Sequence, residues 1–174
     1  AVLLAFWYDT WLLGMGITGL LVISYLSSRY MVRLWTFHRH LVAALLPLFG
    51  AVYIYQMHGL FEMHFVYLIY ATLLIVYRDW RVYITFTTVT VIHHLLFAYL
   101  QNSGLESSYF SQLAYLGLTT MVFHIGLVTL NVLFCSWWAK NMRKQALQEQ
   151  ARRQQLNQQL RNIDNNISFA EEIA

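Results

Sequence analysis

The stretch LVAALLPLFGAVYIY at residues 41–55 is almost wholly apolar and does not alternate between polar and apolar residues. A transmembrane β-strand alternates over about ten residues, whereas a helix that crosses a bilayer needs about 20 consecutive apolar residues. The stretch therefore predicts a membrane-spanning helix, with Pro47 inside it as a predicted kink.

Similar apolar segments recur on both sides of this stretch. The chain is 59% hydrophobic and 11% charged, whereas a soluble domain carries about 25% charged residues. The sequence predicts an all-α integral membrane protein with two parts, a five-helix transmembrane domain at 1–139 and a cytoplasmic helix at 140–174. We expect the five spans at residues 4–26, 41–58, 61–77, 82–101 and 112–138.

The basic residues predict the orientation of this bundle. Arginines occupy the hinges 27–40 and 78–81, and six further Lys and Arg residues lie in the tail from Lys140 onward. The opposite side carries no Lys or Arg, only the acidic residues Asp9, Glu62 and Glu106. Since cytoplasmic loops are enriched in Lys and Arg, the N-terminus is expected outside and the tail inside. Cytoplasmic anchoring also accounts for the net charge of +3 without a nucleic-acid partner.

The tail has the pattern of a signalling helix. Apolar residues alternate at four and three residues, which is a heptad seam typical of a parallel dimeric coiled coil; they are Leu156, Leu160, Ile163, Ile167, Ala170 and Ala174. The sequence therefore predicts a homodimer, and a cytoplasmic signalling module further along the same chain. A solvated amphipathic extension is the alternative.

Five histidines lie in or beside the apolar segments, where an ionisable side chain is costly and marks a functional site by default. We expect them in the outer half of the bundle, where they could bind a cofactor together with a nearby carboxylate. His93 and His94 point about 100° apart on a helix, so only one of them can face the centre fully. The candidate ligands are His58, Glu62, His64, His93, His94 and His124.

Imidazole is a ligand for copper, zinc and haem iron. Soft sulfur from Met57, Met63 and Met121 would favour copper, zinc being possible, whereas haem b would need one histidine from each of two helices. Sequence spacing leaves these cofactors open. No hydrolase motif is present, and the GxGxxG match at 14–19 lies inside a span, so we expect no enzyme. Gly16 and Gly19 are instead predicted to allow close helix packing.

The segment from residue 56 to residue 101 resembles the membrane sensor region of bacterial chemoreceptors and of related diguanylate cyclases. The likeness rests on HGLFEMHF at 58–65, YRDWR at 77–81 and HHLLF at 93–97. A further histidine of many relatives is replaced here by Val66. The resemblance implies a sensory domain of the bacterial inner membrane, with a periplasmic N-terminus and no catalytic role.

Together these features predict a transmembrane sensor that binds a metal ion or haem and signals through its last helix. Two other classes stay open at this stage. One is an electron-transfer subunit linked to haem or quinone, and the other is a proton or metal transporter that uses the histidines as a relay.

Overall fold

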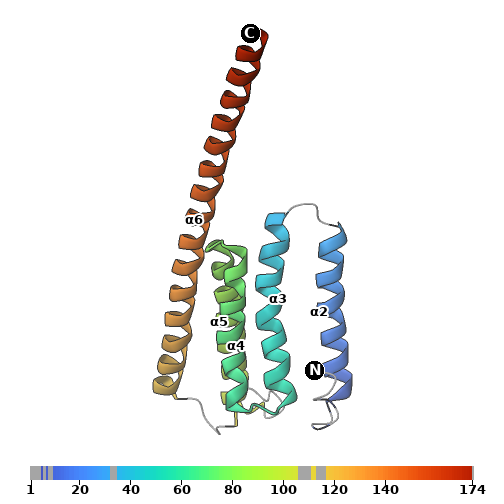
Figure 1. The fold of residues 1–174 in the computed structure, drawn as a ribbon. Helices are drawn as coiled ribbons and strands as arrows, with labels where there is room; N and C mark the ends of the chain where they lie inside the picture. The colour runs from blue at the N-terminus through green and yellow to red at the C-terminus, as the bar shows by residue number, and fades with distance from the viewer. Residues whose placement is uncertain are drawn as a thin grey trace.

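The computed structural model describes residues 5, 7, 10–31, 35–105, 111–112 and 117–173. Within these residues every regular element is helical and no strand occurs. Consecutive helices run in opposite directions, and the last one projects far beyond the others (Figure 1). The elements are α2 (Trp11–Met31), α3 (Trp35–Gln56), η1 (Phe61–Phe65), α4 (Val66–Leu73), η2 (Leu74–Tyr77), α5 (Arg81–Asn102) and α6 (Leu118–Ile173).

Each of the five predicted apolar segments contains a helix, so the all-α prediction is confirmed. Among the residues that the structure describes, three helices are long and apolar enough to cross a membrane: Phe37–Gln56, Arg81–Asn102 and Leu118–Glu172. Gly14–Ser27 and Phe61–Tyr77 are shorter apolar helices. The third segment is divided between the 3₁₀ helices η1 and η2, with α4 between them.

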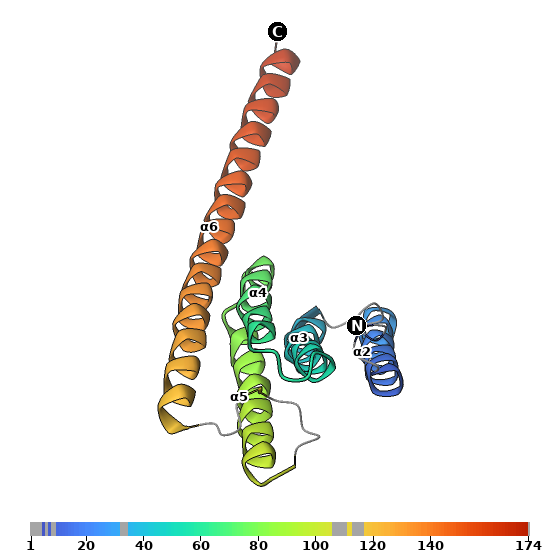
Figure 2. The same cartoon turned by 90° about the horizontal axis from the view of Figure 1, so that it is seen from below.

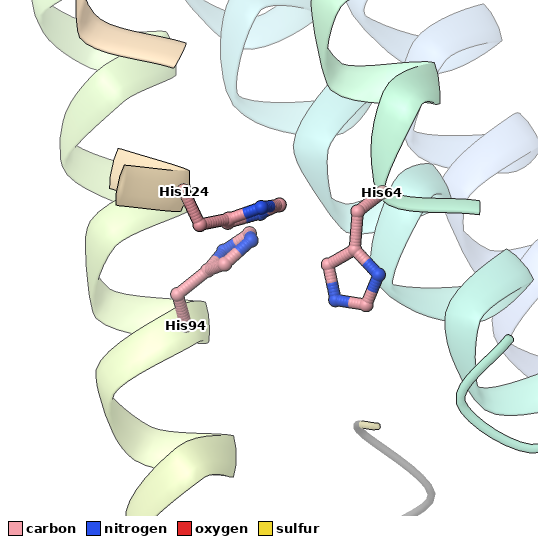
Figure 3. Close-up of side chains that lie close together, drawn as sticks. All are labelled: His64, His94 and His124. Atoms are coloured by element: carbon pink, nitrogen blue, oxygen red, sulfur yellow. The ribbon is translucent and has the colours of Figure 1, made fainter. Parts of the chain in front are cut away.

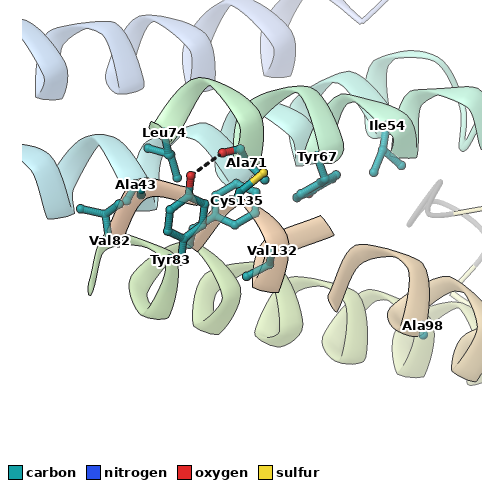
Figure 4. Packing of buried hydrophobic residues seen from close by; sticks show 12 residues of the cluster. Ala43, Ile54, Tyr67, Ala71, Leu74, Val82, Tyr83, Ala98, Val132 and Cys135 are labelled. Carbon is teal, nitrogen blue, oxygen red and sulfur yellow. Dashed lines mark hydrogen bonds between the residues drawn. The ribbon is translucent and has the colours of Figure 1, made fainter. Parts of the chain in front are cut away.

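The core lies where α3, α4, α5 and α6 meet. Its buried side chains come from all four helices, and the hydroxyl of Tyr83 donates to the carbonyl of Ala71 at 3.0 Å (Figure 4). Cys135 is only 2% exposed and packs within this cluster, as expected of a small hydrophobic side chain. Seen along the bundle, α2 and α6 lie at opposite ends of the row of helices (Figure 2).

The glycine at which α2 packs closely against another helix is not one of the two that the sequence predicted. Nothing lies within 4 Å of a Cβ placed on Gly16 or Gly19, whereas a Cβ on Gly14 would collide with the amide of Gln56. The Gln56 side chain is fully buried and donates to the Thr10 hydroxyl at 3.3 Å. Gly14 is therefore the residue that lets α2 approach α3, because a polar side chain of α3 needs its space.

The predicted start of the fifth span at residue 112 is wrong, because α6 begins at Leu118. The segment before it is tied to other parts of the chain: the N–H of Ser111 donates to Gln101 Oε1 at 2.8 Å, and the N–H of Gln112 donates to the carbonyl of Gly59 at 3.2 Å. These bonds fix residues 111 and 112 against the end of α5 and the turn after α3.

α6 is continuous from the bundle into the tail over 56 residues. Its tail extends beyond the end of the bundle at which α3 and α5 begin, so the two basic hinges and the basic tail share one end (Figure 1). The seam residues Leu156, Leu160, Ile163 and Ile167 are 52–55% exposed, so the chain itself does not cover this seam.

Candidate metal centre

Three histidines from three different elements converge at the end of the bundle away from the tail. His64 comes from η1, His94 from α5 and His124 from α6, and one ring nitrogen from each lies within 4.8 Å of the other two. The ring centroids are 5.2–5.7 Å apart. The rings of His94 and His124 are stacked, and the His64 ring lies nearly perpendicular to both (Figure 3). We call these residues the His64–His94–His124 cluster.

The helix boundaries explain why these three rings lie at one level. His64 is near the start of the third apolar segment, and His94 lies about two turns before the end of α5. His124 lies in the second turn of α6 because that helix begins at Leu118. With a start at residue 112, His124 would have been in the fourth turn of the helix and deeper than its partners.

Backbone carbonyls set the proton position on two of the rings. His94 Nδ1 lies 2.8 Å from the carbonyl oxygen of Thr90, and His64 Nδ1 lies 3.2 Å from that of Phe61. A carbonyl can only accept, so Nδ1 carries the hydrogen in both neutral rings. The lone pair is then on Nε2, which is the arrangement that hydrogen bonds to the other nitrogen give in metal-binding histidines.

The third ring, that of His124, differs from the other two in its hydrogen bonding. Its Nε2 is buried and has no hydrogen-bond partner among the described residues. A buried polar atom without a partner costs about 1–3 kcal/mol, which a bound cation would remove. The Nε2 atom of His124 is therefore the strongest local indication that the cluster is a ligand site.

The cluster has nearly the size of a three-coordinate metal site. Three atoms within 4.8 Å of one another share a point at most about 2.8 Å from each, compared with about 2.0–2.1 Å for a zinc–imidazole bond. Each ring would therefore move inward by about 0.7 Å at most when an ion binds. Small side-chain rotations and a slight approach of the helices can provide that movement.

His93 lies beside the cluster and makes a different set of contacts. Its Nδ1 is 3.3 Å from the Tyr67 hydroxyl and 3.4 Å from His94 Nδ1. The Tyr67 hydroxyl donates to the carbonyl of Pro47 at 3.0 Å. A Cβ on Gly50 would approach the Tyr67 ring to 2.9 Å, so this glycine gives the ring its place against α3. His93 therefore connects His94 to α3 through Tyr67.

Two further predicted ligands, besides His93, lie outside the cluster. His58 and Glu62 are both exposed, and neither belongs to a group of potential ligand atoms in the described part of the chain. His58 has φ 49° and follows the end of α3, with the N–H of Gly59 bonded to the Ile54 carbonyl at 2.9 Å. This bond closes a Schellman turn, in which the position of His58 is usually occupied by glycine.

The same turn is covered by the loop that follows α5. Gln101 holds Ser111 through two hydrogen bonds of 3.0 and 2.8 Å, and a Cβ on Gly59 would come within 2.8 Å of the Ser111 backbone. Neither Gln101 nor Tyr67 was among the predicted site residues. A polar side chain at the end of an apolar helix was the available signal for this contact.

Comparisons with protein-family models, with curated proteins and with solved structures gave no match for this chain.

Proposed function

We propose that the chain is a transmembrane sensory domain whose His64–His94–His124 cluster binds one transition-metal ion. The observation that supports this most strongly is the convergence of three imidazole nitrogens within 4.8 Å, together with the unpaired Nε2 of His124. Three neutral imidazoles leave further coordination positions for water or another ligand. An ion bound by them would compensate the cost of keeping these polar rings at membrane depth.

Copper is the ion we favour, and zinc is the second choice. Imidazole suits both metals, whereas thioether sulfur selects Cu(I). Met121 lies one turn before His124 on α6, and Met63 directly precedes His64; both are partly buried and pack against the core. Haem b fits this site less well, because the third ring stands where the macrocycle of a haem held by the other two would lie.

The lengths of the two shorter segments support five membrane crossings. In the third segment, nine 3₁₀ residues and eight α-helical residues span about 30 Å at about 2.0 and 1.5 Å per residue, which matches the hydrocarbon thickness. The 21 residues of α2 also span about 31 Å. With the basic hinges and tail on the cytoplasmic side, the metal site faces the periplasmic side of a bacterial inner membrane.

α6 links the site to the output, because it contributes His124 and continues without interruption into the tail. Contraction of the three ligands around an ion would draw the outer end of α6 toward η1 and α5. A ligand shifts an equilibrium only through its different affinity for two states, and this contraction is the source of that difference. The resemblance of residues 56–101 to chemoreceptor sensor regions supports the same role.

Metal analysis of the purified protein tests the proposal. Protein made in medium with added copper, zinc or hemin should contain about one copper or zinc ion per chain and show no Soret band. His64→Ala and His94→Ala should lose the ion, whereas His38→Ala, at the other end of the bundle, should keep it. A chain that contains no ion under any of these conditions would disprove the proposal, and a Soret band would favour haem.

Disulfide crosslinking tests the dimer that the tail seam predicts. A cysteine at Ile163 should crosslink rapidly between two chains, since seam positions of a parallel coiled coil lie side by side. A cysteine at the neighbouring Asn162, which lies about 100° away around the helix, should crosslink slowly. Equal rates at the two positions would show that the tail has no defined seam.

A further inference from the structure

A long cavity of about 430 Å³ lies between α5 and α6. Its outer end is lined by His94 and His124, and its inner end by Trp80 and Ser136. From Trp80 to His94 the helix rises about 21 Å, so the cavity extends through most of the hydrocarbon depth. Its walls are mainly apolar, with a few threonine hydroxyls among them. We call this cavity the α5–α6 groove.

The α5–α6 groove opens toward the outside of the bundle, because Ile84, Leu95 and Leu133 in its lining are exposed. It lies between two helices that are long and apolar enough to cross a membrane, so this opening is at the depth of lipid acyl chains. The mainly apolar lining matches such a chain, and the occupant then comes from the lipid.

Basic residues continue the groove beyond its inner end. Lys140 follows Ser136 by one turn of α6, and Arg143 follows Lys140 by about another turn. Both side chains are exposed, Arg143 to 51%. Trp80, also exposed, marks the level at which aromatic residues meet lipid headgroups.

One acidic residue faces these charges. Asp79 is 2% exposed and lies 2.8 Å from Arg39 Nη1 and 3.7 Å from Arg143 Nη1. It also accepts the N–H of Arg81 at 3.1 Å. The short ion pair with Arg39 and the hydrogen bond from the Arg81 N–H stabilise most of the charge of this carboxylate. Arg143 is therefore the more loosely held partner, and it can turn toward an anion at the membrane surface.

We infer that the α5–α6 groove binds an anionic phospholipid of the cytoplasmic leaflet, with one acyl chain along the groove and the phosphate at Lys140 and Arg143. An apolar groove of this length fits an acyl chain of about 16 carbons, and basic pockets between transmembrane helices on the cytoplasmic side bind anionic headgroups. The bound chain would reach the level of His94 and His124. The inference does not depend on metal binding.

Such a lipid would act on the helix that carries the output. The acyl chain separates α6 from α5, and the phosphate competes with Asp79 for Arg143. Loss of the lipid would let α6 approach α5 and strengthen the Asp79–Arg143 pair. The composition of the inner leaflet would thereby influence the same helix that the metal site moves.

Native mass spectrometry of the metal-free protein, titrated with phosphatidylglycerol or phosphatidylcholine, tests the headgroup site. The protein should bind phosphatidylglycerol about tenfold more tightly, given about 1 kcal/mol per basic residue and partial use of Arg143 by Asp79. Lys140→Gln/Arg143→Gln should abolish the preference. Arg152→Gln/Arg161→Gln removes the same charge farther along α6 and should preserve it. Equal affinities in the wild type, or an unchanged preference in the first variant, would overturn the inference.

A second pair of variants tests the groove itself. Ser136→Phe fills the inner part of the groove and should weaken the binding of both phospholipids by a similar factor. Leu130→Phe places the same ring on the 67%-exposed outer face of α6 and should leave binding unchanged. Tight phosphatidylglycerol binding in Ser136→Phe would show that the acyl chain does not lie in the groove, and the inference would fail.

Discussion

Loss of His94 should remove the stabilisation of the protein by metal while leaving its fold in place. His94 is 4% exposed, supplies one of the three clustered ring nitrogens of the proposed metal site, and is held by the carbonyl of Thr90. Structural zinc sites contribute about 10–16 kcal/mol from four ligands, or about 3 kcal/mol for each one. His94→Ala should therefore weaken metal affinity by about two orders of magnitude.

This loss converts into a measurable change in melting temperature. Free metal at 100 times the Kd stabilises the folded state by about 2.7 kcal/mol. At about 2–4 °C per kcal/mol for a chain of this size, the wild-type Tm should rise by roughly 5–10 °C. The same metal concentration is near the Kd of His94→Ala, so that the added stability is about 0.4 kcal/mol and the Tm rises by only about 1–2 °C.

The assay is thermal unfolding of the detergent-solubilised protein, followed by intrinsic fluorescence, with and without buffered Cu(I) or Zn²⁺. His40→Ala is a matched control, because His40 is also a partly buried histidine with one short hydrogen bond, 2.7 Å to the Thr85 hydroxyl. It should lower the Tm of the metal-free protein but retain the full rise on metal addition. An equal rise in wild type and His94→Ala, or no rise in the wild type with either metal, would refute the reasoning.

Three further outcomes follow from the fold. A cysteine at Ser103 should react with an impermeant maleimide added outside intact cells, and a cysteine at Arg81 should not; the reverse pattern would contradict the orientation. Gly59→Ala should destabilise the protein by about 2–3 kcal/mol, measured by thermal unfolding, because its Cβ collides with the Ser111 backbone in addition to the positive-φ cost. Gly104→Ala, at φ 88° with open space around it, should cost only about 1 kcal/mol, and equal losses would count against the predicted collision. Tyr67→Phe should lower metal affinity by roughly tenfold, measured by competition with a chelator, because it releases His93 from α3; unchanged affinity would show that the Tyr67–His93 link does not support the site.

The amino-acid sequence was sufficient to predict the helices and their order. Apolar segments longer than about 15 residues have few ways to satisfy their backbone groups in lipid, so composition alone decides that they are helical. The basic hinges, visible in the sequence, end up with the tail at one end of the bundle. Thr90 and His94, four residues apart on one face of α5, are both buried.

The tertiary structure brings three of the six candidate ligands together, and the sequence did not indicate which three. Periodicity could not decide between His93 and His94. The Tyr67 ring contacts both, but His93 Nδ1 lies beside the Tyr67 hydroxyl, whereas the His94 ring lies against His64 and His124. A left-handed turn at His58 and the 3₁₀ geometry of η1 then leave His58 exposed and bury His64.

The level of His124 depends on where α6 begins, which the sequence did not predict. Residues 111 and 112 bond to Gln101 and Gly59, and α6 begins after them at Leu118, which places His124 beside its two partners. Local propensity along the chain determines where apolar helices can form, because each of their hydrogen bonds joins residues four apart. A site built from three elements instead requires helix rotation and depth to be set by long-range contacts, and these exist only once the chain has folded.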